Sequence, residues 1–184
     1  MAGILIIYST STGQTAKIVD HLARRIRDQG HTVECLDVRN LPMDLRLQTY
    51  DGIIIGAPIR MMKFPRPIIR FAKLNRGVLN EARGAFFAVC MAAADTRPEA
   101  QEQIREWVGT FLRETGWSPK VQAVFAGALM YTKYNFITRL VMKRISASEG
   151  RSTDTSRDHE YTDWEVVARF ADEYLALLAR PEAV

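Results

Sequence analysis

The stretch Ile4-Leu5-Ile6-Ile7-Tyr8-Ser9-Thr10-Ser11-Thr12-Gly13-Gln14-Thr15 decides the fold of this chain. Its first five residues form the apolar run of a buried strand, and the next seven are rich in hydroxyl groups. A helical pattern follows, with apolar residues on one face at Ile18, Val19, Leu22, Ala23 and Ile26. A strand that passes through such a turn into a helix brings backbone N–H groups and the positive end of a helix dipole to one point. We therefore expect this turn to bind a phosphate group.

The residues of the turn exclude two common nucleotide-binding loops. There is no lysine of a Walker A motif, and the Gly-x-Gly-x-x-Gly pattern of a dinucleotide fold is absent. Hydroxyls without a lysine suit a phosphate monoester such as the one on FMN. The residues expected to hold it are Thr10, Ser11, Thr12, Gly13, Gln14 and Thr15. An ordinary helix capped by Ser or Thr is the alternative, because both residues are favoured caps.

Length and composition indicate a single domain, residues 1–184, with 47% hydrophobic residues. The apolar runs have the length of strands, so none is expected to cross a bilayer as a helix, and we identify no signal peptide. Cys35 and Cys90 lie in apolar runs and provide no disulfide framework. No acidic spacing matches a metal-binding loop, so no metal is expected. These features predict a cytoplasmic protein.

Strand-like and helical patterns alternate along the chain. Strands are expected at residues 3–8, 32–38, 52–57, 84–90 and 121–129, and helices at 13–29, 67–75, 98–115 and 163–178. Nearly continuous apolar strands are typical of a parallel sheet that is covered on both faces. The pattern predicts an α/β fold with a doubly wound, five-stranded parallel sheet in the flavodoxin-like order 2-1-3-4-5.

In that strand order a ligand binds beyond the carboxyl ends of the strands, beside the first strand. The loops after the third and fourth strands should then flank the ring of the cofactor. Their residues are Ala57, Pro58, Ile59, Arg60 and Met61 in the first loop, and Cys90, Met91, Ala92 and Ala93 in the second. For Arg60 the sequence leaves three orientations open: the flavin, a substrate carboxylate or solvent.

An insert at residues 130–157, after the fifth strand, does not belong to the minimal fold. Residues 127–157 contain six basic and two acidic side chains, and this difference of +4 equals the net charge of the protein. The pattern indicates a basic amphipathic helix that faces a membrane or a large apolar ligand. The residues expected on that side are Tyr131, Tyr134, Arg139, Lys143 and Arg144. An ordinary helix packed on the sheet edge is the alternative.

The chain resembles the flavodoxin-like, quinone-dependent protoporphyrinogen oxidases over nearly its full length. The resemblance rests on the Thr-Gly-Gln-Thr core of the turn, on Ile55-Gly56-Ala57-Pro58-Ile59-Arg60, on Ala126-Gly127-Ala128-Leu129 with the tyrosines that follow, and on Thr153-Asp154-Thr155 and Tyr161-Thr162-Asp163-Trp164. The turn alone indicates only a flavodoxin-like fold. Its combination with the insert is far more specific.

The resemblance implies an FMN enzyme that oxidises protoporphyrinogen IX to protoporphyrin IX in haem biosynthesis and passes the electrons to a membrane quinone. It also implies peripheral contact with an anionic membrane, at the inner face of the cell membrane. The flavin supplies the redox chemistry, so no protein residue is assigned a catalytic role. The alternatives are a flavodoxin-type electron carrier and an FMN-dependent quinone reductase. No nucleic-acid motif accompanies the basic charge, so no nucleic-acid partner is expected, and the sequence leaves open whether the chain forms a homo-oligomer.

Overall fold

The computed structural model describes residues 1–129 and 158–180 of the chain. Five strands form one parallel sheet in the order β2-β1-β3-β4-β5. Their bounds are β1 Gly3–Tyr8, β2 Thr32–Asp37, β3 Gly52–Pro58, β4 Arg83–Cys90 and β5 Val121–Ala126. The predicted fold class and strand order are confirmed.

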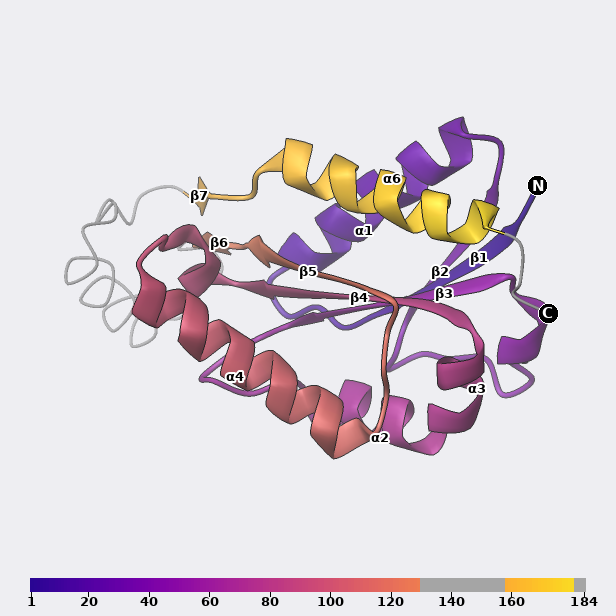
Figure 1. The fold of residues 1–184 in the computed structure, drawn as a ribbon, viewed down its shortest axis with the longest axis horizontal. Coiled ribbons are helices and arrows are strands. Elements are labelled where there is room, and N and C mark those ends of the chain that lie inside the picture. The colour runs from indigo at the N-terminus through magenta and orange to yellow at the C-terminus, as the bar shows by residue number, and fades with distance from the viewer. Residues whose placement is uncertain (130–157, 181–184) are drawn as a thin grey trace.

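Helices cover both faces of the sheet (Figure 1). One face carries α1, Gln14–Asp28, and α6, Trp164–Ala179, and the other carries α2, Arg66–Leu74, α3, Arg76–Glu81, and α4, Pro98–Thr115. Short 3-10 helices, η1 at Leu47–Thr49 and η2 at Met91–Ala94, lie in two of the loops. This three-layer arrangement follows from strands that are apolar on both sides.

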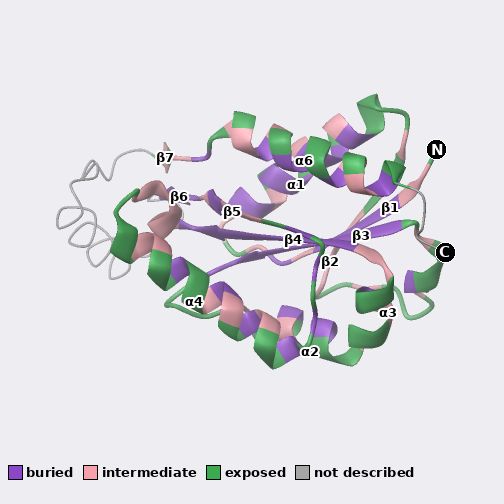
Figure 2. Cartoon of the chain, viewed as in Figure 1, coloured by how far each residue is buried: buried purple, intermediate pink, exposed green. Residues whose placement is uncertain are grey.

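The core is divided by the sheet into two apolar clusters. All seven residues of β3 are buried, and its side chains alternate between the clusters. On the α4 side, Phe86 stacks on Phe111 with ring centroids 4.9 Å apart, whereas on the α6 side Phe87 meets Phe125 at 5.4 Å. Figure 2 shows the same division, with buried residues on the strands and exposed residues on the outer faces of the helices.

The expected fifth strand, residues 121–129, is wrong in its last three residues. β5 ends at Ala126, and Ala128–Leu129 forms β6, which pairs antiparallel with β7, His159–Glu160. Gly127 makes the break: its N–H donates to the carbonyl of Cys90 at 3.1 Å, and its own carbonyl accepts from the N–H of Tyr161 at 3.1 Å. The chain therefore leaves the parallel sheet at Gly127 and enters a second, two-stranded sheet.

Two helical details also differ from the expectation. α3, which follows α2 after the single residue Asn75, was not expected from the sequence. The last helix was expected over residues 163–178, and α6 covers Trp164–Ala179 with Asp163 as its N-cap; the Asp163 carboxylate accepts from the N–H groups of Glu165 and Val166. Thr162 is thereby left for a different contact, described below.

Candidate functional site

The loop between β1 and α1, residues 9–13, lies at the carboxyl edge of the sheet. Ser9 is buried and its N–H donates to the carbonyl of Gly56 at 3.0 Å, which ties the loop to β3. The hydroxyl oxygen of Thr10 accepts from the N–H of Gly13 at 3.1 Å. Gly13 has a φ of 100°, a left-handed conformation that glycine adopts without steric cost. These contacts fold the loop back over the start of α1.

The start of α1 has the donors that a phosphate requires. Gly13 is the N-cap residue, so the helix begins at a residue without a side chain, and the alternative of a Ser- or Thr-capped helix is wrong. The N–H groups of a helix's first turn have no acceptor within the helix. The first turn of α1 also contains no acidic residue that would repel an anion. The cradle therefore fits the phosphate of FMN.

The charges beside this loop are also compatible with an anion. Burial, followed by the nearby carboxylate of Asp37, raises the pKa of Tyr8 at the end of β1, which keeps the phenol neutral. Asp37 itself forms an ion pair with Arg39 at 2.5 Å, and the hydrogen bond from that guanidinium lowers the pKa of the carboxyl group. The negative charge at the end of β2 is thus compensated locally.

Gln14 and Thr15 were expected to hold the phosphate, and both are buried. The side-chain amide of Gln14 donates to the hydroxyl of Thr162 at 2.8 Å, and that hydroxyl donates to the carbonyl of Ala126 at 2.7 Å. This buried chain joins the start of α1 to the end of β5 through the segment that precedes α6. One N–H of the Gln14 side chain is therefore used inside the protein, and the backbone N–H of Gln14 lies in the first turn of α1.

A second group of contacts fastens α1 to the same segment. Lys17 forms an ion pair with Glu160, and its ammonium lies 5.2 Å from the centre of the Trp164 ring. The indole N–H of Trp164 donates to Glu160 at 2.8 Å, and the ring lies 4.9 Å from that of His21. We call residues 14–21 with residues 160–164 the clasp. Sequence reasoning could not identify it, because its two halves are far apart in the chain.

The residues expected beside the cofactor ring fall into two groups. Ala57, Pro58, Ile59 and Cys90 are buried at the ends of β3 and β4, where the N–H of Ile59 donates to the carbonyl of Val89 at 2.8 Å. Arg60 and Met61 are exposed, and Met91, Ala92 and Ala93 are half-buried in η2. The parallel register of β1, β3 and β4 brings both loops to the edge that carries residues 9–13.

The predicted residues of the insert, Tyr131, Tyr134, Arg139, Lys143 and Arg144, lie outside the described residues. The described chain does include the points where the insert departs and returns, which are β6 and β7. The insert therefore starts and ends beside the clasp.

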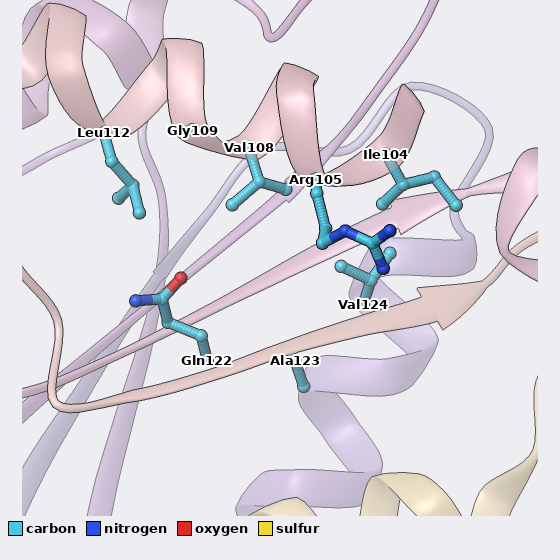
Figure 3. A pocket seen from close by; sticks show the side chains of 8 residues that line it. All are labelled: Ile104, Arg105, Val108, Gly109, Leu112, Gln122, Ala123 and Val124. Carbon is cyan, nitrogen blue, oxygen red and sulfur yellow. The ribbon is translucent and has the colours of Figure 1, made fainter. Parts of the chain in front are cut away.

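A groove of about 310 Å³ lies elsewhere, between α4 and the edge strand β5. Figure 3 shows its lining, which is Ile104, Arg105, Val108, Gly109 and Leu112 from α4 with Gln122, Ala123 and Val124 from β5. None of the predicted site residues contributes to it. Within residues 1–129 and 158–180 we find neither a group of three or more His, Cys, Asp or Glu residues that could hold a metal nor a helix long and apolar enough to cross a membrane.

The fold and the loop geometry define a flavodoxin-type protein, and comparison with known proteins agrees. Residues 5–156 match the flavodoxin domain family. The structure superimposes on that of oxidised flavodoxin 1 from Bacillus cereus with a TM-score of 0.58, at 20% identity, covering 95% of this chain and 98% of that one. The cofactor of this domain is FMN, as the loop chemistry predicted.

Two curated relatives show to which family of flavodoxin-type proteins the chain belongs. The chain is 34% identical over 178 residues to protoporphyrinogen IX dehydrogenase [quinone] of Escherichia coli K12, covering 96% of this chain and 97% of the relative. It is also 34% identical over 175 residues to the protein of the same name from Leishmania major, covering 94% of this chain and 74% of that one. The chain belongs to the protoporphyrinogen IX dehydrogenase [quinone] family and is an oxidoreductase.

Proposed function

We propose that this protein oxidises protoporphyrinogen IX to protoporphyrin IX and passes the electrons to a membrane quinone. The observation that carries the proposal is the match to the E. coli enzyme, which spans nearly the whole of both chains. The match therefore covers more than the flavodoxin domain alone. Two further observations support it: the turn at residues 9–15 leaves the first N–H groups of α1 without a side-chain cap, and the clasp joins this turn to the strands that flank the insert.

The overall reaction removes six electrons and six protons from the porphyrinogen and reduces three quinones to quinols. Bound FMN supplies the two-electron redox chemistry. The residues of the chain bind the FMN and hold it in position. We assign the phosphate to the hydroxyls of Thr10, Ser11 and Thr12 and to the backbone N–H groups at the start of α1. Residues 57–61 after β3 and residues 90–93 after β4 would border the ring, and no side chain is assigned a catalytic role.

The substrate and the quinone are assigned to the side of the molecule that carries the insert. A porphyrinogen has a broad apolar ring and carboxylates, which suits a segment with both aromatic and basic residues. The same composition suits peripheral contact with an anionic membrane at the inner face of the cell membrane. This assignment would place Tyr131, Tyr134, Arg139, Lys143 and Arg144 near the substrate or the membrane.

An anaerobic reaction tests the proposal directly. The FMN-loaded protein is mixed with protoporphyrinogen IX while flavin absorbance and porphyrin fluorescence are recorded together. We expect the flavin to bleach as porphyrin forms, and its colour to return when a quinone is added. A flavin that dithionite reduces but the porphyrinogen does not would contradict the proposal. That result would favour a flavodoxin-type carrier or a quinone reductase that takes electrons from another donor.

A further inference from the structure

The turn after β3 has an unusual backbone. Arg60 and Lys63 exchange both backbone hydrogen bonds, at 2.9 and 3.0 Å, so residues 60–63 form a two-residue hairpin. Its central residues, Met61 and Met62, have φ values of 47° and 63°. They are the non-glycine residues with positive φ in the described part of the chain. Two-residue hairpins with positive φ at both central positions strongly prefer Asn-Gly, so this hairpin carries backbone strain.

The strain is not compensated by packing of the two methionines. The side chain of Met61 is 90% exposed and that of Met62 is 62% exposed. The residues on either side are firmly held, because Ile59 and Phe64 are buried and the ring of Phe64 lies 4.6 Å from that of Phe111. A rigid base thus presents two flexible apolar side chains to water, where they contribute nothing to the core.

The hairpin also lies in the most one-sidedly charged part of the described chain. Residues 52–80 contain no Asp or Glu and six basic residues: Arg60, Lys63, Arg66, Arg70, Lys73 and Arg76. Lys73 forms an ion pair with Glu114 at 2.9 Å. Arg60, Lys63 and Arg66 are exposed, and none of the three forms an ion pair with an acidic residue among those the structure describes. Two exposed methionines are therefore bordered by uncompensated positive charge.

We propose that the 60–63 hairpin is a contact site for an anionic lipid bilayer. Met62, Lys63 and Arg66 are exposed and lie outside the residues assigned to the flavin ring, which end at Met61 in this loop. A projecting apolar tip with basic neighbours matches a bilayer surface, because the thioether groups enter the acyl region while the cations meet anionic headgroups. The proposal rests on the proposed function, since a membrane quinone requires the cofactor edge to face the bilayer. The hairpin lies on that edge, after β3.

Vesicle partition of the FMN-loaded full chain tests the proposal. The vesicles contain phosphatidylcholine with or without phosphatidylglycerol. The double variant Lys63→Gln/Arg66→Gln should weaken partition to the anionic vesicles by about fivefold for each lost cation. Met62→Gly should weaken partition by about fivefold as well, because burial of one thioether side chain is lost. The same variant should raise the melting temperature, because glycine relieves the positive φ.

The rise in melting temperature separates a binding role of Met62 from a structural one. If Met62 served only the fold, its replacement would destabilise the protein and leave vesicle partition unchanged. Leu74→Ser is the control, because Leu74 is 74% exposed at the far end of α2, away from the cofactor edge. It should not alter partition. Wild-type protein that ignores anionic vesicles, or hairpin variants that bind them as wild type does, would overturn the proposal.

Turnover measurements distinguish this proposal from the proposed function. With protoporphyrinogen IX, Lys63→Gln/Arg66→Gln should retain its rate with a soluble electron acceptor and lose rate with a quinone embedded in vesicles. Full rates with both acceptors would contradict the hairpin site and leave the proposed function intact. Failure of the wild type to oxidise the porphyrinogen with any acceptor would contradict the function. The partition measurement needs no turnover and would still decide on the hairpin.

Discussion

The two sides of the cofactor edge are built in opposite ways. On the side of α1, the clasp joins distant segments by polar contacts, with the buried Gln14–Thr162–Ala126 chain at the centre and the exposed Lys17–Glu160 pair at the rim. On the side of β3, the 60–63 hairpin closes on itself and leaves two methionines in water. One side satisfies its polar groups inside the protein. The other exposes apolar groups that nothing in the described chain covers.

This difference is consistent with two separate proposed roles along one edge of the sheet, phosphate binding beside α1 and bilayer contact after β3. A phosphate needs fixed donors, and in the proposed function the clasp would support the loop that holds them. A bilayer needs a projecting apolar group rather than a closed pocket, which the hairpin provides. The comparison can therefore be tested by loosening the clasp and by relaxing the hairpin, with FMN affinity and stability measured separately in each case.

The largest effect is expected at Gly13. Replacement by Val puts a β-branched residue at a φ of 100°, which costs about 1–3 kcal/mol, or shifts the loop. The N–H groups of the first turn would then be displaced from the phosphate. We expect FMN binding to weaken by about tenfold to a hundredfold, measured by fluorescence titration of the apoprotein.

Gly30→Ala is the matched control for Gly13→Val. Gly30 has a φ of 83°, and a Cβ added there would meet no atom within 4 Å, so the substitution adds a related strain without a clash. Gly30 follows the other end of α1, so Gly30→Ala should lower the melting temperature and leave FMN affinity unchanged. Equal loss of FMN affinity in both variants would show that general instability, and not the loop, controls binding.

Thr162→Val breaks the centre of the clasp. The side chains have nearly the same shape, but the hydroxyl is lost, and the buried amide of Gln14 and the carbonyl of Ala126 lose their partner. This should destabilise the protein by about 1–3 kcal/mol. Because Gln14 begins α1, FMN affinity should also fall several-fold. Thermal unfolding and FMN titration measure the two effects.

Thr115→Val shows whether the loss of FMN affinity is specific to the clasp. Thr115 is also buried, and its hydroxyl donates to the carbonyl of Phe111 at 2.9 Å within α4, on the other face of the sheet. The variant should lose stability and keep its FMN affinity. If Thr162→Val likewise leaves FMN affinity untouched, the clasp is a stabilising contact that does not support the phosphate loop.

The sequence predicted the elements on the α1 side of this edge better than the hairpin after β3, for physical reasons. An apolar run, a hydroxyl-rich turn and an amphipathic helix are adjacent in the chain. The local sequence of residues 4–26 is therefore enough to predict their secondary structure. The partner of Gln14 lies 148 residues away, and only folding brings Thr162 to it. Gly127 ends β5 although the next residues stay apolar, so the apolar pattern could not locate the break.

The hairpin was missed because its sequence contains no turn signal. Arg-Met-Met-Lys lacks the Gly, Asn, Asp or Pro that normally marks a two-residue turn. Its strain is therefore invisible in the sequence. Residues 52–80 contain no acidic residue, but acidic residues elsewhere balance their positive charge, so the charge of the whole chain does not indicate this segment.

Relaxing the hairpin should raise the free energy of unfolding, whereas loosening the clasp should lower it. Met61→Asn/Met62→Gly installs the residues that the backbone prefers, and should stabilise the protein by about 1 kcal/mol. For a chain of this size that corresponds to a rise of about 2–4 °C in melting temperature. A lower melting temperature would show that the methionines support the fold, and would remove the contrast between the two sides.

The smallest effect is expected at the exposed rim of the clasp. Lys17→Met removes the ion pair with Glu160 and the ammonium above Trp164 while retaining an unbranched side chain. The Lys17 side chain is 56% exposed, so the loss should be about 0.5–1 kcal/mol at low salt and smaller at high salt, where exposed charges are screened. Lys73→Met, which removes the exposed pair with Glu114 on the other face, should show a similar salt dependence. If Lys17→Met weakens FMN binding as strongly as Thr162→Val does, the support of the phosphate loop comes from the exposed ion pair rather than from the buried hydrogen bonds.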